Sequence, residues 1–345
     1  MKICPKDPRM SWHNVAEWSA QEHGLRPERV PQDWRSRFEE AAAWRAVQPA
    51  GVKLRFRTDS RNVVLHWKQW ETTISMLDQG EAYCAGELVG VFNTSDPASK
   101  MISRFRANGE GMADWEILLP WSVALEIESI DVDDDARVDE CQVDIAKGKM
   151  LCYGDSITQG YCASGPSLTW PHLLADKIKW NTINLGFGGA AFCEPEVAEY
   201  IASRSDWDAL TVTAGINTAA SGRESASSFH DTYKAFLEIV RSTHPYKPIL
   251  CITPMFYSTA DGDDTWLNAC GCRVSEYREA VESVVSERSA SGDKHIHLLD
   301  GLAIIGSEEY LADTVHPIDE GMRRVAVMIA EKWKENGLVD EIRIQ

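Results

Sequence analysis

The first part of the chain alternates between hydrophobic and polar residues with a period of two. Residues 52–57 show the pattern most clearly, and it is typical of a strand with one buried face. Similar short segments follow, separated by polar turns at 78–80 and 108–109, and they predict strands over 63–67, 72–77, 87–92, 102–105, 115–119 and 123–132. Many short strands joined by polar turns predict an antiparallel β-sandwich. A short helix is expected earlier, over 35–47.

From about residue 149 the pattern changes to short hydrophobic strands alternating with longer amphipathic helices. Strands are predicted over 150–153, 182–185, 209–213, 249–252 and 296–299, and helices over 170–178, 225–243, 275–289 and 320–336. Strands that alternate with helices predict a parallel sheet covered by helices on both faces, which is a three-layer α/β/α domain. We therefore expect two domains: an N-terminal β-sandwich over 1–147 and an α/β domain over 148–345.

Composition narrows the choice of partners. The 345 residues include 35 Lys and Arg against 53 Asp and Glu, a formal net charge of −18. A chain this acidic repels phosphate backbones and anionic lipids, so neither nucleic acid nor a membrane surface is an expected partner. No apolar run approaches the roughly 18 residues of a membrane span, and the first residues do not resemble a secretory signal. The nine cysteines, an odd number, are typical of a reducing compartment, and a cytoplasmic location is expected.

Four polar motifs lie directly after predicted strands or before the last helix. They are Gly-Asp-Ser at 154–156, Asn-Leu-Gly-Phe-Gly-Gly at 184–189, Gly-Ile-Asn at 215–217 and Asp-Thr-Val-His at 313–316. Open parallel sheets place their sites at the carboxyl ends of their strands, so these motifs can converge on one site.

Taken together, the four motifs resemble the SGNH, or GDSL, hydrolase family over roughly residues 149–336. The resemblance implies a flavodoxin-like α/β/α fold with Ser156 as nucleophile and Asp313 and His316 as the other members of a triad. It also implies that Gly189 donates its backbone N–H, and Asn217 its side-chain amide, to an oxyanion. The third motif usually ends Gly-x-Asn-Asp, and here Thr218 replaces the Asp.

The same residues have a chemical rationale of their own. A serine hydroxyl becomes a good nucleophile only when a nearby base takes its proton, and the imidazole of His316 suits that task. Asp313, three residues earlier, can hold the other ring nitrogen. The backbone N–H groups of Ser156 and Gly189 and the Asn217 amide would stabilise the oxyanion, and losing one such donor costs about 10²–10³ in turnover.

Asp155 and Phe187, which adjoin these motifs, are further candidates for substrate contact. In isolation, Asp313 would be a helix N-cap, His316 a surface residue and Asn217 a turn residue. Their joint occurrence with the serine and glycine motifs favours catalysis.

Gly186-x-Gly188-x-x-Ala191 also matches a loose dinucleotide-binding fingerprint. The dipeptide Glu194-Pro195 interrupts the helix expected after such a motif, so an oxyanion loop is the preferred interpretation.

Weaker patterns suggest other ligands. Asp131-x-Asp133-x-Asp135 resembles the start of a calcium loop, but Ala136 stands where glycine is required and Gln142 where glutamate is required. Cys270 and Cys272 are a close pair without a second pair elsewhere, so no zinc site is expected. Trp12, Trp18, Trp34 and Trp44 could form a sugar-stacking platform, although tryptophan more often anchors a core.

The expected function is hydrolysis of carboxylic esters through an acyl-enzyme on Ser156, without metal or organic cofactor. A short-chain acyl group, such as acetyl, on a carbohydrate or small molecule is the expected substrate. Acyl transfer to an alcohol is the alternative, and a non-catalytic glycan-binding protein is a more distant one. Some relatives look similar in carrying a sandwich domain that helps wall the cleft, so loops of residues 1–146 are expected to influence selectivity. The oligomeric state is open.

Overall fold

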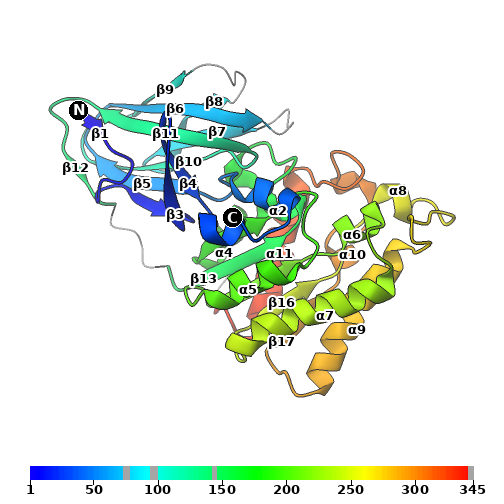
Figure 1. The fold of residues 1–345 in the computed structure, drawn as a ribbon. Helices are drawn as coiled ribbons and strands as arrows, with labels where there is room; N and C mark the ends of the chain where they lie inside the picture. The colour runs from blue at the N-terminus through cyan, green and yellow to red at the C-terminus, as the bar shows by residue number, and fades with distance from the viewer. Residues whose placement is uncertain (73–77, 94–99, 142–145, 341–345) are drawn as a thin grey trace. The chain divides into compact units, whose positions relative to one another are not determined.

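The computed structural model describes residues 1–72, 78–93, 100–141 and 146–340 (Figure 1). The chain divides into two compact units. The first comprises Met1–Gln32, Ala46–Ile145 and Ser164–Ser167, and the second comprises Asp33–Arg45, Ala146–Ala163 and Leu168–Gln345. With a single domain boundary near residue 147, each unit would be continuous in sequence. Instead, the first unit includes Ser164–Ser167 and the second includes Asp33–Arg45.

Two antiparallel sheets form the first unit. One has the order β3-β4-β11-β6-β9, with β1 paired to β11, and its strands are β1 (Lys2–Ile3), β3 (Glu17–Gln21), β4 (Gly24–Glu28), β6 (Asn62–Thr72), β9 (Lys100–Arg106) and β11 (Val123–Val132). The other has the order β12-β5-β10-β7-β8, with β2 paired to β5, and its strands are β2 (Ser11–His13), β5 (Lys53–Thr58), β7 (Gln79–Cys84), β8 (Glu87–Asn93), β10 (Ala113–Leu118) and β12 (Val138–Asp139). A shared hydrophobic core joins the two sheets, which confirms the predicted β-sandwich.

The period of two in β5 explains its place in this core. Leu54 and Phe56 are fully buried, whereas Arg55 and Arg57 between them are partly exposed. Phe56 lies opposite Trp115 of β10, and their rings stack with centroids 6.3 Å apart. Aromatic pairs across strands are among the contacts that stabilise a sheet.

Some local predictions for this region were wrong. A turn was predicted at 78–80, but β7 begins at Gln79. Gly80 pairs with Phe92 of the neighbouring strand β8, whose ring leaves no room for a Cβ at residue 80. The helix expected over 35–47 is two short helices, α1 (Gln32–Arg35) and α2 (Glu40–Ala46). The strand predicted over 72–77 falls on residues outside the described ones, apart from Thr72 at the end of β6.

The second unit is built on a five-stranded parallel sheet with the order β14-β13-β15-β16-β17. Its strands are β13 (Lys149–Gly154), β14 (Asn181–Gly186), β15 (Ala209–Thr213), β16 (Ile249–Ile252) and β17 (Ile296–Leu299). In order along the chain this is 2-1-3-4-5, the flavodoxin-like arrangement, so the predicted three-layer α/β/α fold is confirmed. The order reverses at β13, and a crevice at its carboxyl end is where such sheets bind ligands.

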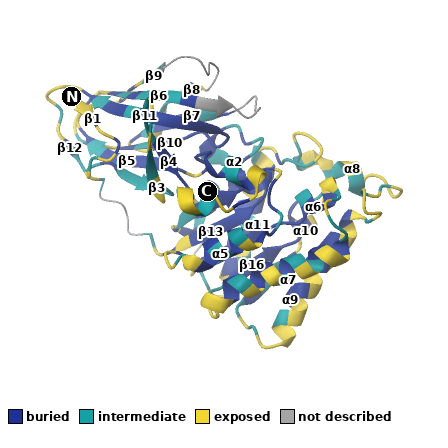
Figure 2. Ribbon diagram, viewed as in Figure 1, coloured by how far each residue is buried: buried dark blue, intermediate teal, exposed yellow. Residues whose placement is uncertain are grey.

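Helices cover both faces of this sheet (Figure 1). They are α3 (Ser156–Gln159), α4 (Trp170–Ile178), α5 (Pro195–Ser203), α6 (Ile216–Ser221), α7 (Ala226–Thr243), α8 (Ser258–Asp261), α9 (Val274–Ala290), α10 (Gly301–Ile304) and α11 (Asp319–Glu335), with 3-10 turns at Pro166–Leu168 and Glu308–Tyr310. α4 packs against α11 on one face, and α7 packs against α5 and α9 on the other. α7 and α9 are buried on one side and exposed on the other, as expected for surface helices (Figure 2).

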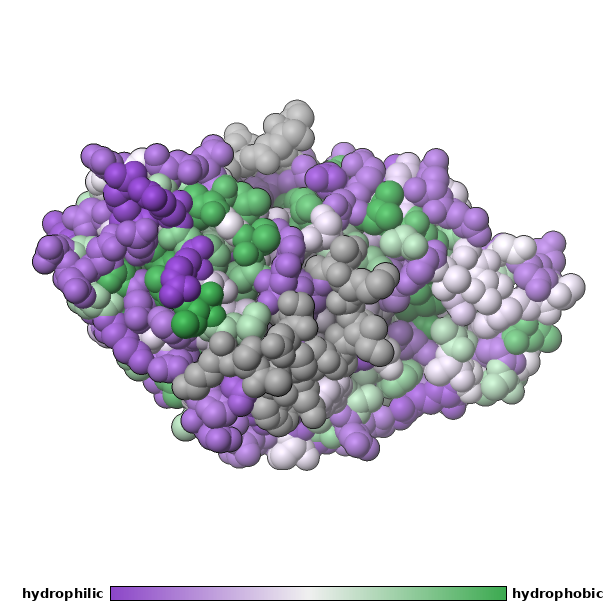
Figure 3. All heavy atoms as spheres, turned by 90° about the horizontal axis from the view of Figure 1, so that it is seen from above, coloured by the Kyte–Doolittle hydropathy of each residue, from purple (hydrophilic) through white to green (hydrophobic). Residues whose placement is uncertain are grey.

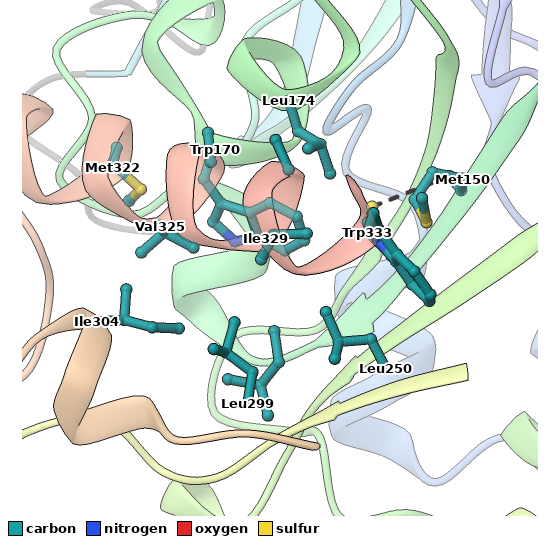
Figure 4. Packing of buried hydrophobic residues seen from close by; sticks show 14 of the residues in the cluster. Met150, Trp170, Leu174, Leu250, Leu299, Ile304, Met322, Val325, Ile329 and Trp333 are labelled. Carbon is teal, nitrogen blue, oxygen red and sulfur yellow. Dashed lines mark hydrogen bonds between the residues drawn. The ribbon is translucent and has the colours of Figure 1, made fainter. Parts of the chain in front are cut away.

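The core beneath α4 and α11 shows how the sequence anchors the sheet (Figure 4). Trp333 of α11 is fully buried beside Met150 of β13 and Leu250 of β16, and Trp170 of α4 is fully buried beside Ile329 of α11. Truncating a buried tryptophan typically costs about 3–5 kcal/mol, so these side chains help to fix the strands that carry the polar motifs.

The surface carries both hydrophilic and hydrophobic side chains. Hydrophilic residues predominate on the face seen in Figure 3, with smaller hydrophobic areas between them. Leu88, Val91 and Ile102 are examples of large hydrophobic side chains that are about half exposed, at 51%, 46% and 47%. Among the described residues, no helix combines the length and hydrophobicity needed to cross a membrane.

Candidate active site

Ser156 lies just beyond the carboxyl end of β13, the strand at which the order of the parallel sheet reverses. β13 ends at Gly154, and Ser156 is the first residue of the single helical turn α3. Asp155 caps this turn, since its side chain accepts a hydrogen bond from the N–H of Ile157 at 2.9 Å. The sharp change from strand to helix places the Ser156 side chain at the carboxyl end of the sheet.

The imidazole of His316 connects Ser156 with Asp313. Nε2 of His316 lies 2.8 Å from Oγ of Ser156, and Nδ1 lies 2.7 Å from Oδ2 of Asp313. An ionised carboxylate only accepts hydrogen bonds, so Nδ1 carries the ring proton and Nε2 is left to accept the proton of the serine hydroxyl. This is the geometry of a nucleophile, a base and a group that orients the base.

A closed loop holds the two C-terminal members of this arrangement. Oδ1 of Asp313 accepts the backbone N–H groups of Val315 and His316, each at 2.8 Å. Ala312 donates to the carbonyl of His316, and Leu311 pairs with Pro317 as a short bridge before α11 begins. Desolvation opposes ionisation of Asp313, but the hydrogen bonds from His316 and Val315 outweigh it and hold the pKa of the carboxyl below its ordinary value.

Hydrogen bonds link the glycine motif after β14 to the turn Ser156–Gln159, here named the nucleophile turn. Side chains from both segments make these bonds. Asn184 donates from Nδ2 to the carbonyl of Thr158 and accepts the N–H of Gly186, each at 2.8 Å. Gln159 accepts the N–H of Gly188 at 2.8 Å. A Cβ on Gly186 would stand 2.2 Å from the backbone nitrogen of Gln159, so only glycine permits this approach.

The donors expected for an oxyanion lie in the turn that carries Ser156, in the glycine loop after β14 and in α6. Gly189 has φ +70°, and Asn217, in the first turn of α6, uses its Oδ1 to accept the N–H of Ala191 at 3.1 Å. Within the described chain, the backbone N–H groups of Ser156 and Gly189 and the amide nitrogen of Asn217 make no hydrogen bond. A Cβ on Gly189 would meet nothing within 4 Å, so glycine is favoured there by its φ angle and not by a close approach.

Comparison with known proteins identifies the family. The sequence matches the GDSL-like lipase/acylhydrolase family over residues 147–334, which is more than half of the chain. The chain belongs to this family. The match covers the sheet, the nucleophile turn and the loop of Asp313 and His316. Among curated proteins, the comparison found no match.

Solved structures resemble the chain beyond the GDSL-like region. A salicylyl-acyltransferase from a tetracycline biosynthetic pathway is 22% identical, with 98% of each chain covered and a TM-score of 0.85. A protein from Bacteroides ovatus described as a GDSL-like lipase is 21% identical, with 98% of this chain and 97% of that one covered and a TM-score of 0.79. A family two carbohydrate esterase from Clostridium thermocellum is 15% identical, covers 84% of this chain and 94% of its own, and has a TM-score of 0.66. At these identities the likeness establishes the fold.

This GDSL-like chain departs from its family at Thr218, where the usual residue is Asp. Thr218 is fully buried in α6, and its hydroxyl has no hydrogen-bond partner within the described residues. Gly215, with φ +119°, starts α6 and leaves Asn217 in the first turn. The substitution therefore leaves an unpaired hydroxyl in the interior without displacing the asparagine.

The two proposed substrate contacts are buried in the GDSL-like unit. Asp155 is 4% exposed as the cap of α3, and desolvation raises its pKa to about 6 despite hydrogen bonds from Ile157 and Thr158. Phe187 is fully buried, with its ring against those of Phe38 and Tyr153. Neither side chain is presented to solvent, so both support the loops that carry Ser156 and Gly189.

A small cavity lies behind the nucleophile turn. Its volume of about 10 Å³ accommodates roughly one water molecule, and it is lined by Asp155, Ile157, Thr213, Ala214, Ile216, Ile252, Thr253, Pro254, Met255 and Val315. Ser156 is not among the residues that line this space.

The structure brings further residues to Ser156, His316 and Asp313 that the sequence did not indicate. The ring of Tyr161 stacks on the imidazole of His316, with centroids 5.5 Å apart. The thiol of Cys162 lies within 4.8 Å of ligand atoms of Asp313 and His316. Arg45 of α2 donates to the Tyr161 hydroxyl at 2.8 Å. Tyr161 and Cys162 follow the Ser156 turn closely, which is a weak hint, but Arg45 lies in residues assigned from sequence to the other domain.

The alternative ligand motifs have structural explanations. The dipeptide Glu194-Pro195 does not interrupt a helix, because Glu194 is the N-cap and Pro195 the first residue of α5, a position that proline favours. Asp133 accepts the N–H groups of Arg61 and Asn62 and so closes a turn before β6. Trp12 packs edge-on against Trp18 with centroids 5.0 Å apart.

Proposed function

We propose that this protein is a serine-dependent ester hydrolase, with Ser156 as nucleophile, His316 as base and Asp313 as the group that orients the base. The continuous contact from Asp313 Oδ2 through the imidazole to Ser156 Oγ, at 2.7 and 2.8 Å, carries this proposal. Membership of the GDSL-like lipase/acylhydrolase family supports acyl chemistry.

The proposed reaction has two acyl-transfer steps. Ser156 Oγ attacks the ester carbonyl while His316 Nε2 takes the hydroxyl proton, and the carbonyl oxygen becomes an oxyanion. The N–H groups of Ser156 and Gly189 and the amide of Asn217 would stabilise this charge. The C–O bond to the alcohol then breaks, and His316 returns the proton to the departing alcohol. Water, activated by His316, releases the acid from the acyl-enzyme.

We propose a short acyl group on a carbohydrate or small-molecule alcohol as the substrate. A family two carbohydrate esterase shares the fold, which makes acetylated sugars reasonable first substrates.

Acyl transfer to an alcohol other than water is the second candidate. It is named because a salicylyl-acyltransferase resembles this chain over 98% of both lengths. The same acyl-enzyme serves both reactions, and the acceptor decides between them: exclusion of water favours transfer.

The test compares wild type with Ser156→Ala on p-nitrophenyl acetate and acetylated xylose, with and without added alcohols. Hydrolysis by wild type that is lost in a folded Ser156→Ala variant supports the hydrolase. A new ester that forms faster than free acid supports acyl transfer. Equal rates in wild type and variant would show that Ser156 is not the nucleophile.

A further inference from the structure

A segment from the N-terminal part of the sequence braces the glycine loop of the second unit. Asp33–Arg45 belongs to this unit. Phe38 packs edge-on against Phe187 of the loop with ring centroids 6.1 Å apart. Glu39 pairs with Arg223, whose guanidinium lies 4.4 Å from the centroid of Phe192. These contacts fix both ends of the loop that contains Gly189.

Arg45, at the end of this segment, makes two hydrogen bonds at the site. Its Nε donates to the carbonyl oxygen of Gly188 at 2.7 Å, and its Nη1 donates to the hydroxyl of Tyr161 at 2.8 Å. The planar guanidinium presents its donors in a fixed geometry, so it can hold these two acceptors in a defined relation.

The bond to Gly188 bears directly on the oxyanion donor. The carbonyl of Gly188 and the N–H of Gly189 belong to the same peptide, which is planar, and in a trans peptide they point in opposite directions. Fixing the carbonyl oxygen therefore fixes the direction of the Gly189 N–H. The charge of the guanidinium also polarises this peptide and strengthens its N–H as a donor.

The bond to Tyr161 bears on the base. The backbone N–H of Tyr161 donates to the carbonyl of Ser156 at 2.9 Å, and its ring stacks on His316 at an interplanar angle of 27°. Holding the phenol keeps the ring against one face of the imidazole.

We propose that Arg45 is a positioning residue that aligns the Gly188–Gly189 peptide with the imidazole of His316 through Tyr161. This role rests on the proposed function of Ser156, His316 and Gly189. It makes a residue outside the GDSL-like match part of the machinery that stabilises the oxyanion.

The test uses Arg45→Ala, Arg45→Lys and Tyr161→Phe, with Arg37→Ala as the matched control. Arg37 lies in the same segment but pairs with Glu199 of α5. Two readouts are taken: the rate at which a fluorophosphonate labels Ser156, located by mass spectrometry, and the amide resonance of Gly189 in ¹⁵N-glycine spectra. Turnover of p-nitrophenyl acetate adds kcat and KM.

Arg45→Ala should slow labelling and kcat by about tenfold or more, since small misplacements of catalytic groups cost up to about 10². KM should change less than twofold, and the Gly189 resonance should move. Arg45→Lys should recover part of the rate, because it keeps the charge but cannot hold both acceptors in a fork. Tyr161→Phe should lower the labelling rate and kcat less than Arg45→Ala does. Arg37→Ala should have the labelling rate and kcat of wild type.

Two failures are distinguishable. If wild type is labelled at Ser156 and Arg45→Ala is labelled equally fast with the Gly189 resonance unmoved, the positioning role is overturned and the hydrolase proposal stands. If wild type is not labelled at Ser156, the proposed function fails and takes the positioning role with it.

Discussion

The side-chain oxygen of Asn217 accepts the backbone N–H of Ala191 at 3.1 Å, which ties α6 to the glycine loop after β14. Because the oxygen is used in this way, the amide nitrogen on the other side of the group remains for an oxyanion. We expect Asn217→Ala to lower kcat by about 10²–10³ with a smaller change in KM, as for other oxyanion donors. Steady-state kinetics with p-nitrophenyl acetate measure this.

Asn217→Asp separates the two roles of this side chain. The carboxylate can still accept the N–H of Ala191, but it cannot donate and brings a negative charge to the oxyanion. It should therefore be at least as inactive as Asn217→Ala while unfolding at a similar urea concentration. An aspartate variant with near wild-type kcat would mean that the amide is not a donor in the reaction.

Asp313→Asn should abolish most activity with little loss of stability. Asparagine keeps an oxygen for the N–H groups of Val315 and His316, but its NH₂ group would face Nδ1 and favour the wrong imidazole tautomer. The expected loss in kcat is about 10⁴-fold. Asp313→Ala, which loses the loop bonds as well, should also unfold at lower urea. Retention of activity in Asp313→Asn would remove Asp313 from the triad.

Asp155 makes stability depend on pH. Burial raises the pKa of this carboxyl from 3.8 to about 6, so the folded state prefers the protonated form. The contribution of Asp155 to stability is then greatest below the unfolded-state pKa, falls as pH rises through the window from 3.8 to about 6, and stays lower above it. Two pKa units correspond to roughly 3 kcal/mol as an upper bound.

Asp155→Asn should remove this dependence, because a neutral amide can still accept the N–H of Ile157. At pH 8 the free energy of unfolding of the variant should exceed that of wild type by about 1–3 kcal/mol. At pH 3.5 the two free energies should be equal. Urea unfolding at both pH values decides the point. Equal stability at pH 8 would show that the Asp155 carboxylate is well solvated or paired in the folded protein.

The parts of the fold that sequence predicted well are those in which burial dominates. β15 and β16 are buried along their whole length, and α4 and α11 keep a clear helical period, so the predicted ends of these strands and helices were close to the observed ones. The first three motifs converge because the order of the sheet brings the ends of β13, β14 and β15 side by side, and the loop before α11 brings His316 to Ser156.

What the sequence could not indicate depends on contacts between distant segments. Nothing in residues 33–45 shows that Arg45 reaches Gly188 or that Phe38 packs on Phe187, because both contacts span more than a hundred residues. One practical consequence concerns truncation. Deleting residues 1–146 would remove this brace from the second unit, so a change of selectivity in that variant would not by itself implicate the sandwich.

Two glycines of the second motif should respond differently to alanine. A Cβ at Gly186 would stand 2.2 Å from the backbone nitrogen of Gln159. A Cβ at Gly189 would meet nothing within 4 Å, so the strain there would come only from holding alanine at a φ of +70°. Gly189→Ala should therefore cost about 1–2 kcal/mol in unfolding free energy. Gly186→Ala should cost more and also slow labelling of Ser156, because the nucleophile turn must shift. Equal losses of stability would contradict this reading of the loop.

Zinc is expected to inhibit the enzyme through Cys162. Ligand atoms of Cys162, Asp313 and His316 all lie within 4.8 Å of one another, and thiolate, carboxylate and imidazole are the groups that Zn²⁺ prefers. Zn²⁺ held there would compete for the hydrogen bonds of the triad. Burial and the Asp313 charge raise the pKa of the Cys162 thiol to about 11, so the metal must displace a proton and inhibition should strengthen as pH rises.

The measurement is the Zn²⁺ concentration that halves esterase activity in wild type and in Cys162→Ser, at pH 6.5 and pH 8. Cys162→Ser should keep wild-type activity without metal and need about tenfold more Zn²⁺ for the same inhibition, because a hydroxyl is a much poorer zinc ligand. EDTA should restore wild type fully, and Mg²⁺, which prefers oxygen ligands, should have no effect on either protein. If wild type and Cys162→Ser are equally sensitive at both pH values, the metal acts elsewhere and the thiol has no part in it.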